Sequence, residues 1–109
     1  MANPVLVIAR DGDVWVFRST ERAANWMEAQ DVRDGEYRLF ECDGREYQLS
    51  AESDLGPVIV SGPSVTSTGL DLVRVGAARF IATVAPSTSD RNVSGGNARL
   101  CEVLWAYAQ

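Results

Sequence analysis

Apolar and polar residues recur along this chain in patterns that predict five strands and three helices. Val5–Ala9 is a continuous apolar run, which suits a strand buried on both faces. Val14–Phe17 follows an Asp-Gly pair, and two apolar runs joined by Asp-Gly are typical of a β-hairpin. A helix is expected next, with Ser19 as its N-cap and Gly35 suited to the chain reversal at its end.

A second hairpin is predicted from two alternating segments, residues 36–42 and 45–49, on either side of another Asp-Gly pair. A two-residue turn at this pair places Glu41 directly opposite Glu46. Like charges in that position cost from a few tenths up to ~1 kcal/mol in a sheet. We therefore expect these two glutamates to have a functional reason for lying together.

Alternation of side chains also assigns the two faces of this hairpin. The side interpreted as the core face carries Phe40, Cys42, Tyr47 and Leu49, with Arg38 and Arg45 nearer the ends. The side interpreted as the solvent face carries Tyr37, Leu39, Glu41, Glu46 and Gln48. In the first hairpin the same turn geometry places Arg10 opposite Asp13, which is a favourable pair.

The second half of the chain is expected to hold one short strand and two helices. Residues 58–60 lie between two prolines and suit an edge strand. Apolar residues recur at helical spacing over 70–84, although β-branched residues and Gly76 leave a strand as the alternative. Residues 86–96 read as a polar, mobile loop, and 98–107 as a terminal helix.

These elements predict an α+β protein, an antiparallel sheet built from two β-hairpins (ββαββ) and covered by helices on one face, with two C-terminal helices. The 109 residues suit one domain spanning residues 1–109. A chain of this length buries roughly two thirds of its unfolded surface, which is enough for a single core.

The net charge of −5 is concentrated in one quarter of the chain. Residues 28–54 contain nine acidic residues and three arginines, whereas the rest has six acidic residues and seven arginines. Clustered carboxylates speed the association of a positively charged partner and repel partners of like charge. A solvated face that only aids solubility is the alternative.

The predicted partner-binding residues are the acidic residues of this segment that surround the second hairpin, with one tryptophan as an anchor. They are Glu41, Asp43, Glu46, Asp34, Glu36 and Trp26. All three tryptophans lie in apolar segments that favour core packing, and Trp26 is the one expected to be partly exposed because Asn25 and Glu28 flank it. An exposed tryptophan beside an acidic face suits an interface. Trp15 and Trp105 are interpreted as core residues.

The composition argues against catalysis and against most cofactors. The chain contains neither histidine nor lysine, so a histidine base, a Schiff-base lysine and a P-loop lysine are excluded. Paired glutamates on an exposed hairpin would lack the desolvation that separates the pKa values of an acid and a base. We expect no catalytic residue, no metal and no cofactor, and the acidic charge disfavours nucleic acid.

Cys42 and Cys101 are interpreted as reduced core residues, with a disulfide as the less favoured alternative. No apolar run approaches the ~18 residues of a membrane helix. The N-terminal residues lack the charged lead and cleavage site of a signal peptide, so a cytoplasmic location is predicted.

The stretch DGDVWVFRSTERAANWMEAQDVRDGEYRLFECDGREYQLS, residues 11–50, resembles small bacterial immunity proteins encoded beside secreted polymorphic toxins. The likeness covers about residues 4–50 and lies in a hairpin, a short helix and a DGEY turn into a second hairpin. It implies a cytoplasmic protein that blocks a cognate toxin by tight binding without catalysis. The alternatives are a general interaction or regulatory module, with a homodimer formed through sheet edges or the terminal helix, and a small enzyme that uses carboxylates.

Overall fold

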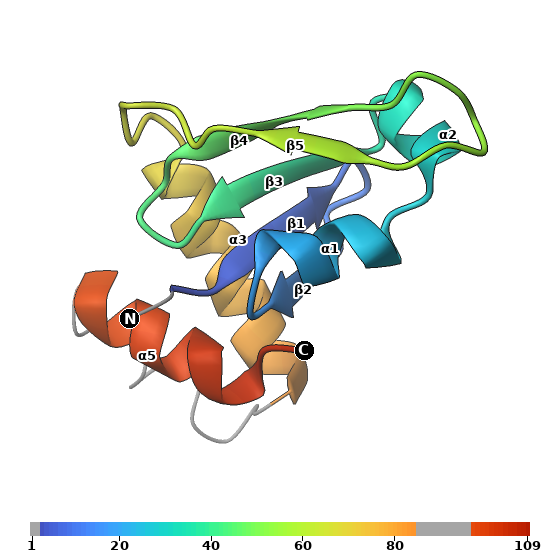
Figure 1. Cartoon of the computed structure of the whole chain (residues 1–109). Helices are drawn as coiled ribbons and strands as arrows, with labels where there is room; N and C mark the ends of the chain where they lie inside the picture. The colour runs from blue at the N-terminus through green and yellow to red at the C-terminus, as the bar shows by residue number, and fades with distance from the viewer. Residues whose placement is uncertain (1–2, 85–96) are drawn as a thin grey trace.

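A computed structural model describes residues 3–84 and 97–109, and a five-stranded antiparallel sheet lies at its centre (Figure 1). In chain order the strands are β1 (Val5–Ala9), β2 (Val14–Phe17), β3 (Tyr37–Glu41), β4 (Glu46–Ser50) and β5 (Ile59–Ser61). Their order in space is β2-β1-β3-β4-β5, so the β1–β2 and β3–β4 hairpins are joined by pairing between β1 and β3. The most apolar strand, β1, is therefore an interior strand with a partner on each side, which agrees with its prediction as a strand buried on both faces.

The helices of the described residues are α1 (Thr20–Trp26), α2 (Ala29–Arg33), α3 (Leu70–Val84) and α5 (Asn97–Tyr107). The α+β class, the antiparallel sheet and the two C-terminal helices are confirmed, as is the Ser19 cap, whose Oγ accepts from the Arg22 backbone N–H at 3.1 Å. Two short helices follow β2 where one was expected, because the backbone is extended at Met27 and Glu28. The predicted loop at residues 86–96 lies outside the described residues.

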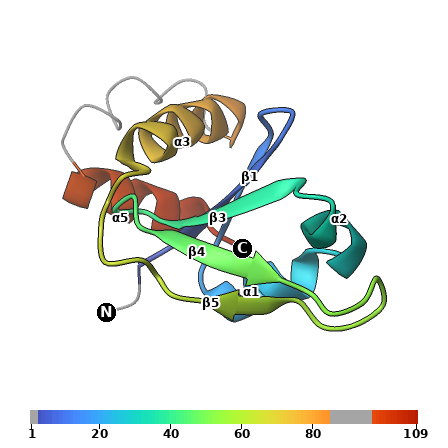
Figure 2. The ribbon, with the colours of Figure 1, turned by 90° about the horizontal axis from the view of Figure 1, so that it is seen from above.

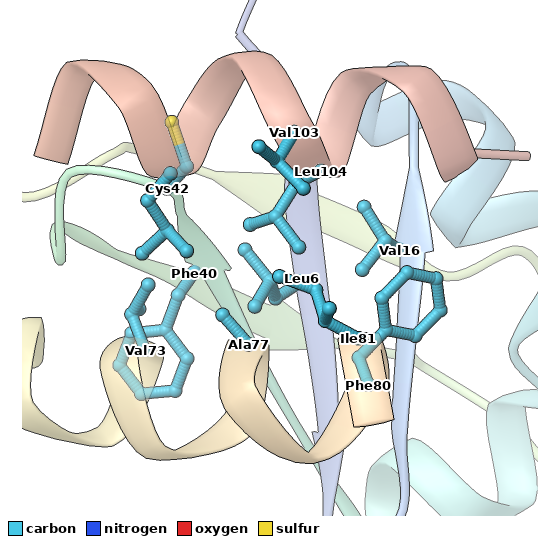
Figure 3. Packing of buried hydrophobic residues seen from close by; sticks show 11 residues of the cluster. Leu6, Val16, Phe40, Cys42, Val73, Ala77, Phe80, Ile81, Val103 and Leu104 are labelled. Carbon is cyan, nitrogen blue, oxygen red and sulfur yellow. The ribbon is translucent and has the colours of Figure 1, made fainter. Parts of the chain in front are cut away.

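Helices cover both faces of the sheet, which corrects the prediction of one covered face (Figures 1 and 2). One buried cluster lies between the sheet and α3 with α5, and includes Leu6, Val16 and Phe40 (Figure 3). The other lies on the α1 and α2 side and includes Val7 and Leu39. Adjacent residues of one strand, such as Leu39 and Phe40, are both fully buried because each face has its own helical cover.

The two hairpins contain three-residue loops, not the two-residue turns that the Asp-Gly pairs predict. The Glu41 N–H donates to the Arg45 carbonyl at 2.8 Å, and the Gly44 N–H donates to the Glu41 carbonyl at 2.9 Å. Gly44 has a φ of 94°, a left-handed conformation that costs glycine little. The first hairpin repeats this pattern, so Ala9, not Arg10, lies opposite Asp13. Likewise, Glu41 lies opposite Arg45 and not opposite Glu46.

This shift of one residue moves the whole of β4 to the opposite face from the one predicted. Tyr47 is paired with Leu39 and faces α1 and α2, whereas Glu46 is paired with Phe40 and faces α3. Leu39 is buried, although alternation had assigned it to the solvent face. Glu41 and Glu46 therefore lie on opposite faces of the sheet.

A disulfide joins Cys42 to Cys101, so the prediction of two reduced cysteines is wrong. The Cα atoms are 5.8 Å apart, and the bond ties the β3–β4 loop to α5 across 59 residues of sequence. Closing a loop of that length restricts the unfolded chain by about 4 kcal/mol in the chain-entropy model. The pairing is not apparent from the sequence because it depends on how α5 lies against the sheet.

The two edges of the sheet differ in how they are protected. At the β2 edge the C-terminal Gln109 exchanges two backbone hydrogen bonds with the strand, at 2.8 Å to Arg18 and 2.9 Å to Val16. The β5 edge has no described partner beyond β4, but it is only three residues long, and prolines at 57 and 63 flank it, as predicted. None of the helices in the described part of the chain is both long and apolar enough to cross a bilayer.

Candidate binding site

The structure separates the six predicted site residues into two groups. Glu41, Asp43 and Glu46 lie in or beside the β3–β4 hairpin, where each is engaged within the molecule. Asp34, Glu36 and Trp26 lie at the other end of the sheet, near the end of α1 and the start of β3. Only the second group forms part of an accessible candidate site.

Two of the three carboxylates in the first group, those of Asp43 and Glu46, are paired with neighbouring arginines. Both oxygens of Glu46 accept from Arg38, at 2.8 and 2.9 Å, and this bond raises the pKa of Arg38. Asp43 accepts from the Arg45 side chain at 2.8 Å. A partner would have to displace these arginines before it could use either carboxylate.

Glu41 is buried, although it was predicted to face solvent. Only 8% of the residue is exposed, and its carboxylate accepts a hydrogen bond of 2.5 Å from the Tyr47 hydroxyl. Burial, and after it this bond to Glu41, raises the pKa of Tyr47 well above its ordinary value. Glu41 is thus part of the protein interior on the α1 and α2 side.

Pairing with arginine extends through the whole acidic segment. Four of its nine acidic residues form salt bridges, in the pairs Arg10–Glu36, Arg33–Asp54, Arg38–Glu46 and Arg45–Asp43. The charge imbalance of residues 28–54 therefore does not produce one continuous acidic face around the second hairpin. The surface that stays both acidic and accessible is smaller and lies elsewhere.

That surface is built around three aromatic side chains, Trp15, Trp26 and Tyr37, which we call the aromatic patch. The ring centroids of Trp15 and Trp26 are 4.6 Å apart, and those of Trp26 and Tyr37 are 5.5 Å apart. Trp15 and Tyr37 meet edge to face at 6.3 Å. Trp26 is 37% exposed, so the patch presents an aromatic surface to solvent.

The sheet brings two of these rings together because the strands that carry them, β2 and β3, are the two neighbours of β1. Trp15 on β2 is paired with Val7, and Tyr37 on β3 is paired with Ala9, so both project on the same side of β1. The small Ala9 side chain leaves room between them. The helix α1 ends at Trp26, which places the third ring over the other two.

Four carboxylates, Asp11, Asp31, Asp34 and Glu36, border the aromatic patch, and we call them the acidic rim. Together with Ala9, Trp15 and Tyr37 they line a hollow of about 200 Å³. The Tyr37 hydroxyl donates to Asp31 at 3.3 Å. Burial, followed by the negative charge of Asp31, raises the pKa of Tyr37, so its phenol stays neutral.

The acidic rim keeps an excess of negative charge. Arg10 approaches Glu36 at 3.6 Å and donates to the Asp34 backbone carbonyl, and both members of the salt bridge are well exposed. The Asp34 carboxylate forms no ion pair with any described residue. Aromatic faces and carboxylates both attract cations, so the combination suits a guanidinium or ammonium group.

A metal site is not found among the described residues. Within residues 3–84 and 97–109, no group of three His, Cys, Asp or Glu side chains lies close enough together to hold a metal ion. The prediction that the protein is not an enzyme stays a prediction.

Sequence reasoning missed Trp15, Tyr37, Asp11 and Asp31 as site residues. Trp15 alternates with two valines, a pattern that predicts a core position, and Tyr37 lies on the predicted solvent face without a known neighbour. Both rings would have been identified if the pairing of β1 with β3 had been known. The strands β2 and β3 flank β1, and the two rings project from the same face of the sheet. No protein-family model, curated protein or solved structure matches this chain.

Proposed function

We propose that this protein is a non-catalytic binding protein that captures a positively charged protein partner on the aromatic patch and acidic rim. In its specific form, we propose an immunity protein that neutralises a cognate bacterial toxin. The observation that carries the proposal is the contact of Trp15, Trp26 and Tyr37 beside four carboxylates at the surface.

The chemistry of the patch supports a protein partner with exposed arginine or lysine. Tryptophan and tyrosine are the residues most enriched at the energetic centres of interfaces. A partner guanidinium stacked on Trp26 would lie beside Tyr37, which lines the hollow together with Asp34, and the Asp34 carboxylate is not engaged by any described arginine. The carboxylates would also speed association by long-range attraction, an effect that salt weakens.

The immunity role is supported by where the resemblance lies. The segment of residues 11–50 that resembles immunity proteins contains all three rings and all four carboxylates. A toxin inhibitor needs only a surface complementary to its toxin, which agrees with a site made of aromatic and acidic side chains. Tight binding is therefore the activity to test.

The proposed location requires one adjustment to the sequence prediction. Cytosolic reductants keep most thiols reduced, whereas the Cys42–Cys101 disulfide suits an oxidising compartment such as the periplasm. Trapping the thiols with an alkylating agent in intact cells, followed by mass spectrometry, would show which state of the cysteines is present.

The test is to look for a basic toxin domain encoded beside this protein, or captured by it from the native organism, and to measure the affinity between the two. Trp26→Ala removes the exposed ring and should weaken binding by about 30-fold or more, the effect of an interface hot spot. Asp34→Asn removes one rim charge and should slow association about three- to ten-fold at low salt, with less effect at high salt.

Asp71→Asn is the matched control, because it removes the same charge from an exposed position on α3, across the sheet. It should leave both the affinity and the association rate within about two-fold of wild type. Circular dichroism of each variant would exclude misfolding. Equal effects of Asp34→Asn and Asp71→Asn, or full affinity of Trp26→Ala, would overturn the proposal.

The alternative is an interaction module that acts as a homodimer through the β5 edge. The observations that favour it are the unpaired side of β5 within the described residues and the 41% exposure of Ile59. Light scattering over a range of concentrations would show a rise in mass that Ile59→Lys abolishes. A constant monomeric mass would remove this alternative.

A further inference from the structure

A groove on the opposite side of the sheet from the aromatic patch has a different chemistry. It lies between α3 and the ends of β1 and β3, and its volume is about 370 Å³. Apolar side chains line much of it, including Ile8, Val14, Phe40, Leu72 and Val75. Three arginines, Arg10, Arg38 and Arg79, border it together with a single carboxylate, Glu36. Arg10 and Arg38 are paired with carboxylates, so the unpaired positive charge at the border of this groove is that of Arg79, whereas the acidic rim is negative.

The α3 helix carries a second stripe of residues that face the groove and not the core. Leu72, Val75, Gly76 and Arg79 follow the spacing i, i+3, i+4 and i+7, which places them on one face of the helix. Leu72 is 44% exposed and Val75 is 63% exposed. Two large apolar side chains are thus left in contact with water along the groove, next to an arginine.

Gly76 brings this stripe close to the sheet. A Cβ atom at this position would lie 3.2 Å from Ile8 Cδ1 and 3.3 Å from Val14 Cγ2, so these two side chains would have to shift by a few tenths of an ångström to admit it. The close approach forms the apolar base of the groove between α3 and β1. An apolar ligand body would find contacts on both walls.

The three arginines differ in how far the protein satisfies them. Arg38 is held by both oxygens of Glu46, and Arg10 is paired with Glu36. Arg79 donates to the Gly12 backbone carbonyl at 3.0 Å, and no carboxylate in the described residues forms a salt bridge with it. A guanidinium has five N–H donors, so Arg79 retains both its charge and donors for an anion.

We propose that this groove binds a small amphipathic anion, with an apolar body and one carboxylate or sulfonate group. Leu72, Val75 and Ile8 would contact the body, and Arg79 would hold the anionic group. The volume falls within the range of roughly 300–1,000 Å³ typical of small-molecule sites. Charge complementarity favours an anion over a neutral or cationic ligand, because Arg79 is the arginine of this groove that forms no salt bridge with any described carboxylate.

The probe is 8-anilinonaphthalene-1-sulfonate, an aromatic sulfonate whose fluorescence rises in apolar sites. Its matched neutral partner is N-phenyl-1-naphthylamine, which has the same apolar body without the sulfonate. The proposal expects saturable binding of one sulfonate probe per protein, displacement of the probe by decanoate, and at least about ten-fold weaker binding of the neutral probe.

Arginine variants on α3 test the position of the charge. Arg79→Gln should weaken binding of the sulfonate probe by about ten-fold, while Arg79→Lys should stay within about three-fold of wild type because it keeps the charge. Arg74→Gln, on the same helix but outside the groove, is the control and should change nothing. Val75→Glu, which places a carboxylate one helical turn before Arg79, where it can pair with the guanidinium, should also abolish binding.

Several results would overturn this site. One is that the wild type shows no saturable binding of the sulfonate probe, and another is that it binds the two probes equally. The others are that Arg79→Gln and Arg74→Gln lose equal affinity for the sulfonate probe, or that the groove binds only an acidic peptide. Unchanged thermal midpoints would show that the variants remain folded. Val75 does not border the acidic rim, whereas Arg79 lines a neighbouring hollow with Asp11 and Trp15. Val75→Glu should therefore keep its affinity for the proposed protein partner, which separates a failure of this site from a failure of that proposal.

Discussion

The two faces of the sheet are built from alternate residues of the same strands, yet they differ in how completely they are covered. The α3 and α5 helices, of 15 and 11 residues, close one face, and a disulfide ties α5 to the β3–β4 loop. The other face has only α1 and α2, of seven and five residues. Short helices bury the middle of that face but leave aromatic rings at its margin. An exposed aromatic surface can therefore form there without opening the core.

The largest effects should come from the buried centre of each face. Phe40→Ala, on the α3 side, is expected to lower the free energy of unfolding by about 3–5 kcal/mol, and Leu39→Ala, on the other side, by about 2–5 kcal/mol. Urea unfolding measures both. If Leu39→Ala lowered the free energy of unfolding by less than about 1 kcal/mol, the α1 and α2 face would not contain a well-packed core.

Loss of the disulfide, which lies on the α3 and α5 side of the sheet, should have the next largest effect on stability. Reduction is expected to lower the free energy of unfolding by about 2–4 kcal/mol. The measurement is urea unfolding with and without a reductant, together with a count of free thiols. The double variant Cys42→Ala/Cys101→Ala is the control and should not respond to reductant. Two titratable thiols in the untreated native protein would contradict the bond.

On the opposite face, Tyr47→Phe should lower the free energy of unfolding by about 1–3 kcal/mol, because it leaves the buried Glu41 carboxylate without its hydrogen-bond donor. Tyr107→Phe, at an exposed position of α5, is the control and should be close to neutral. Equal stability of the two variants would show that the Tyr47–Glu41 bond contributes nothing.

The same bond predicts how stability changes at high pH. The folded pKa of Tyr47 is raised above its ordinary value of 10.0, so below about pH 10 both states hold the proton and stability is complete. Above that pH the unfolded chain releases the proton first, and stability falls by at most about 1.4 kcal/mol per pH unit for each such tyrosine. The chain has no lysine, so few other groups titrate there. Tyr47→Phe should reduce the slope measured between pH 9 and 11.

The smallest effect is expected for Glu46→Gln, which removes an exposed salt bridge with Arg38 on the α3 side. Such pairs contribute up to about 1 kcal/mol, so the loss should be small and should shrink at high salt. Thermal unfolding at two salt concentrations measures it. A gain in stability would instead support the glutamate repulsion that the two-residue turn predicted.

Most elements of the fold were predictable because they follow local rules. Periodicity located the helices at 70–84 and 98–107, and the apolar run of β1 predicted a strand buried on both faces. The hairpin register was not, because an Asp-Gly pair suits both a two-residue turn and the end of a three-residue loop. That ambiguity of one residue was enough to place Glu46 on the wrong face.

The candidate site was predictable only in part. Trp26, Asp34 and Glu36 were identified from exposure and charge, which depend on nearby residues. Trp15 and Tyr37 were missed because their meeting depends on pairing between β1 and β3, which are distant in sequence. Glu41 was expected to face solvent, and this was wrong because its burial depends on the register and on the Tyr47 hydroxyl.

The central claim is that the aromatic patch and acidic rim attract cationic protein side chains, and the three tryptophans allow a direct test. Titration of the ¹⁵N-labelled protein with tetra-arginine at low salt should shift the indole N–H signals of Trp15 and Trp26. Trp105, which lies on α5 under Arg18, should stay unchanged and serves as the internal reference. Tetra-glutamate should shift none of them. Equal movement of all three signals with tetra-arginine, or movement of Trp105 alone, would contradict the account.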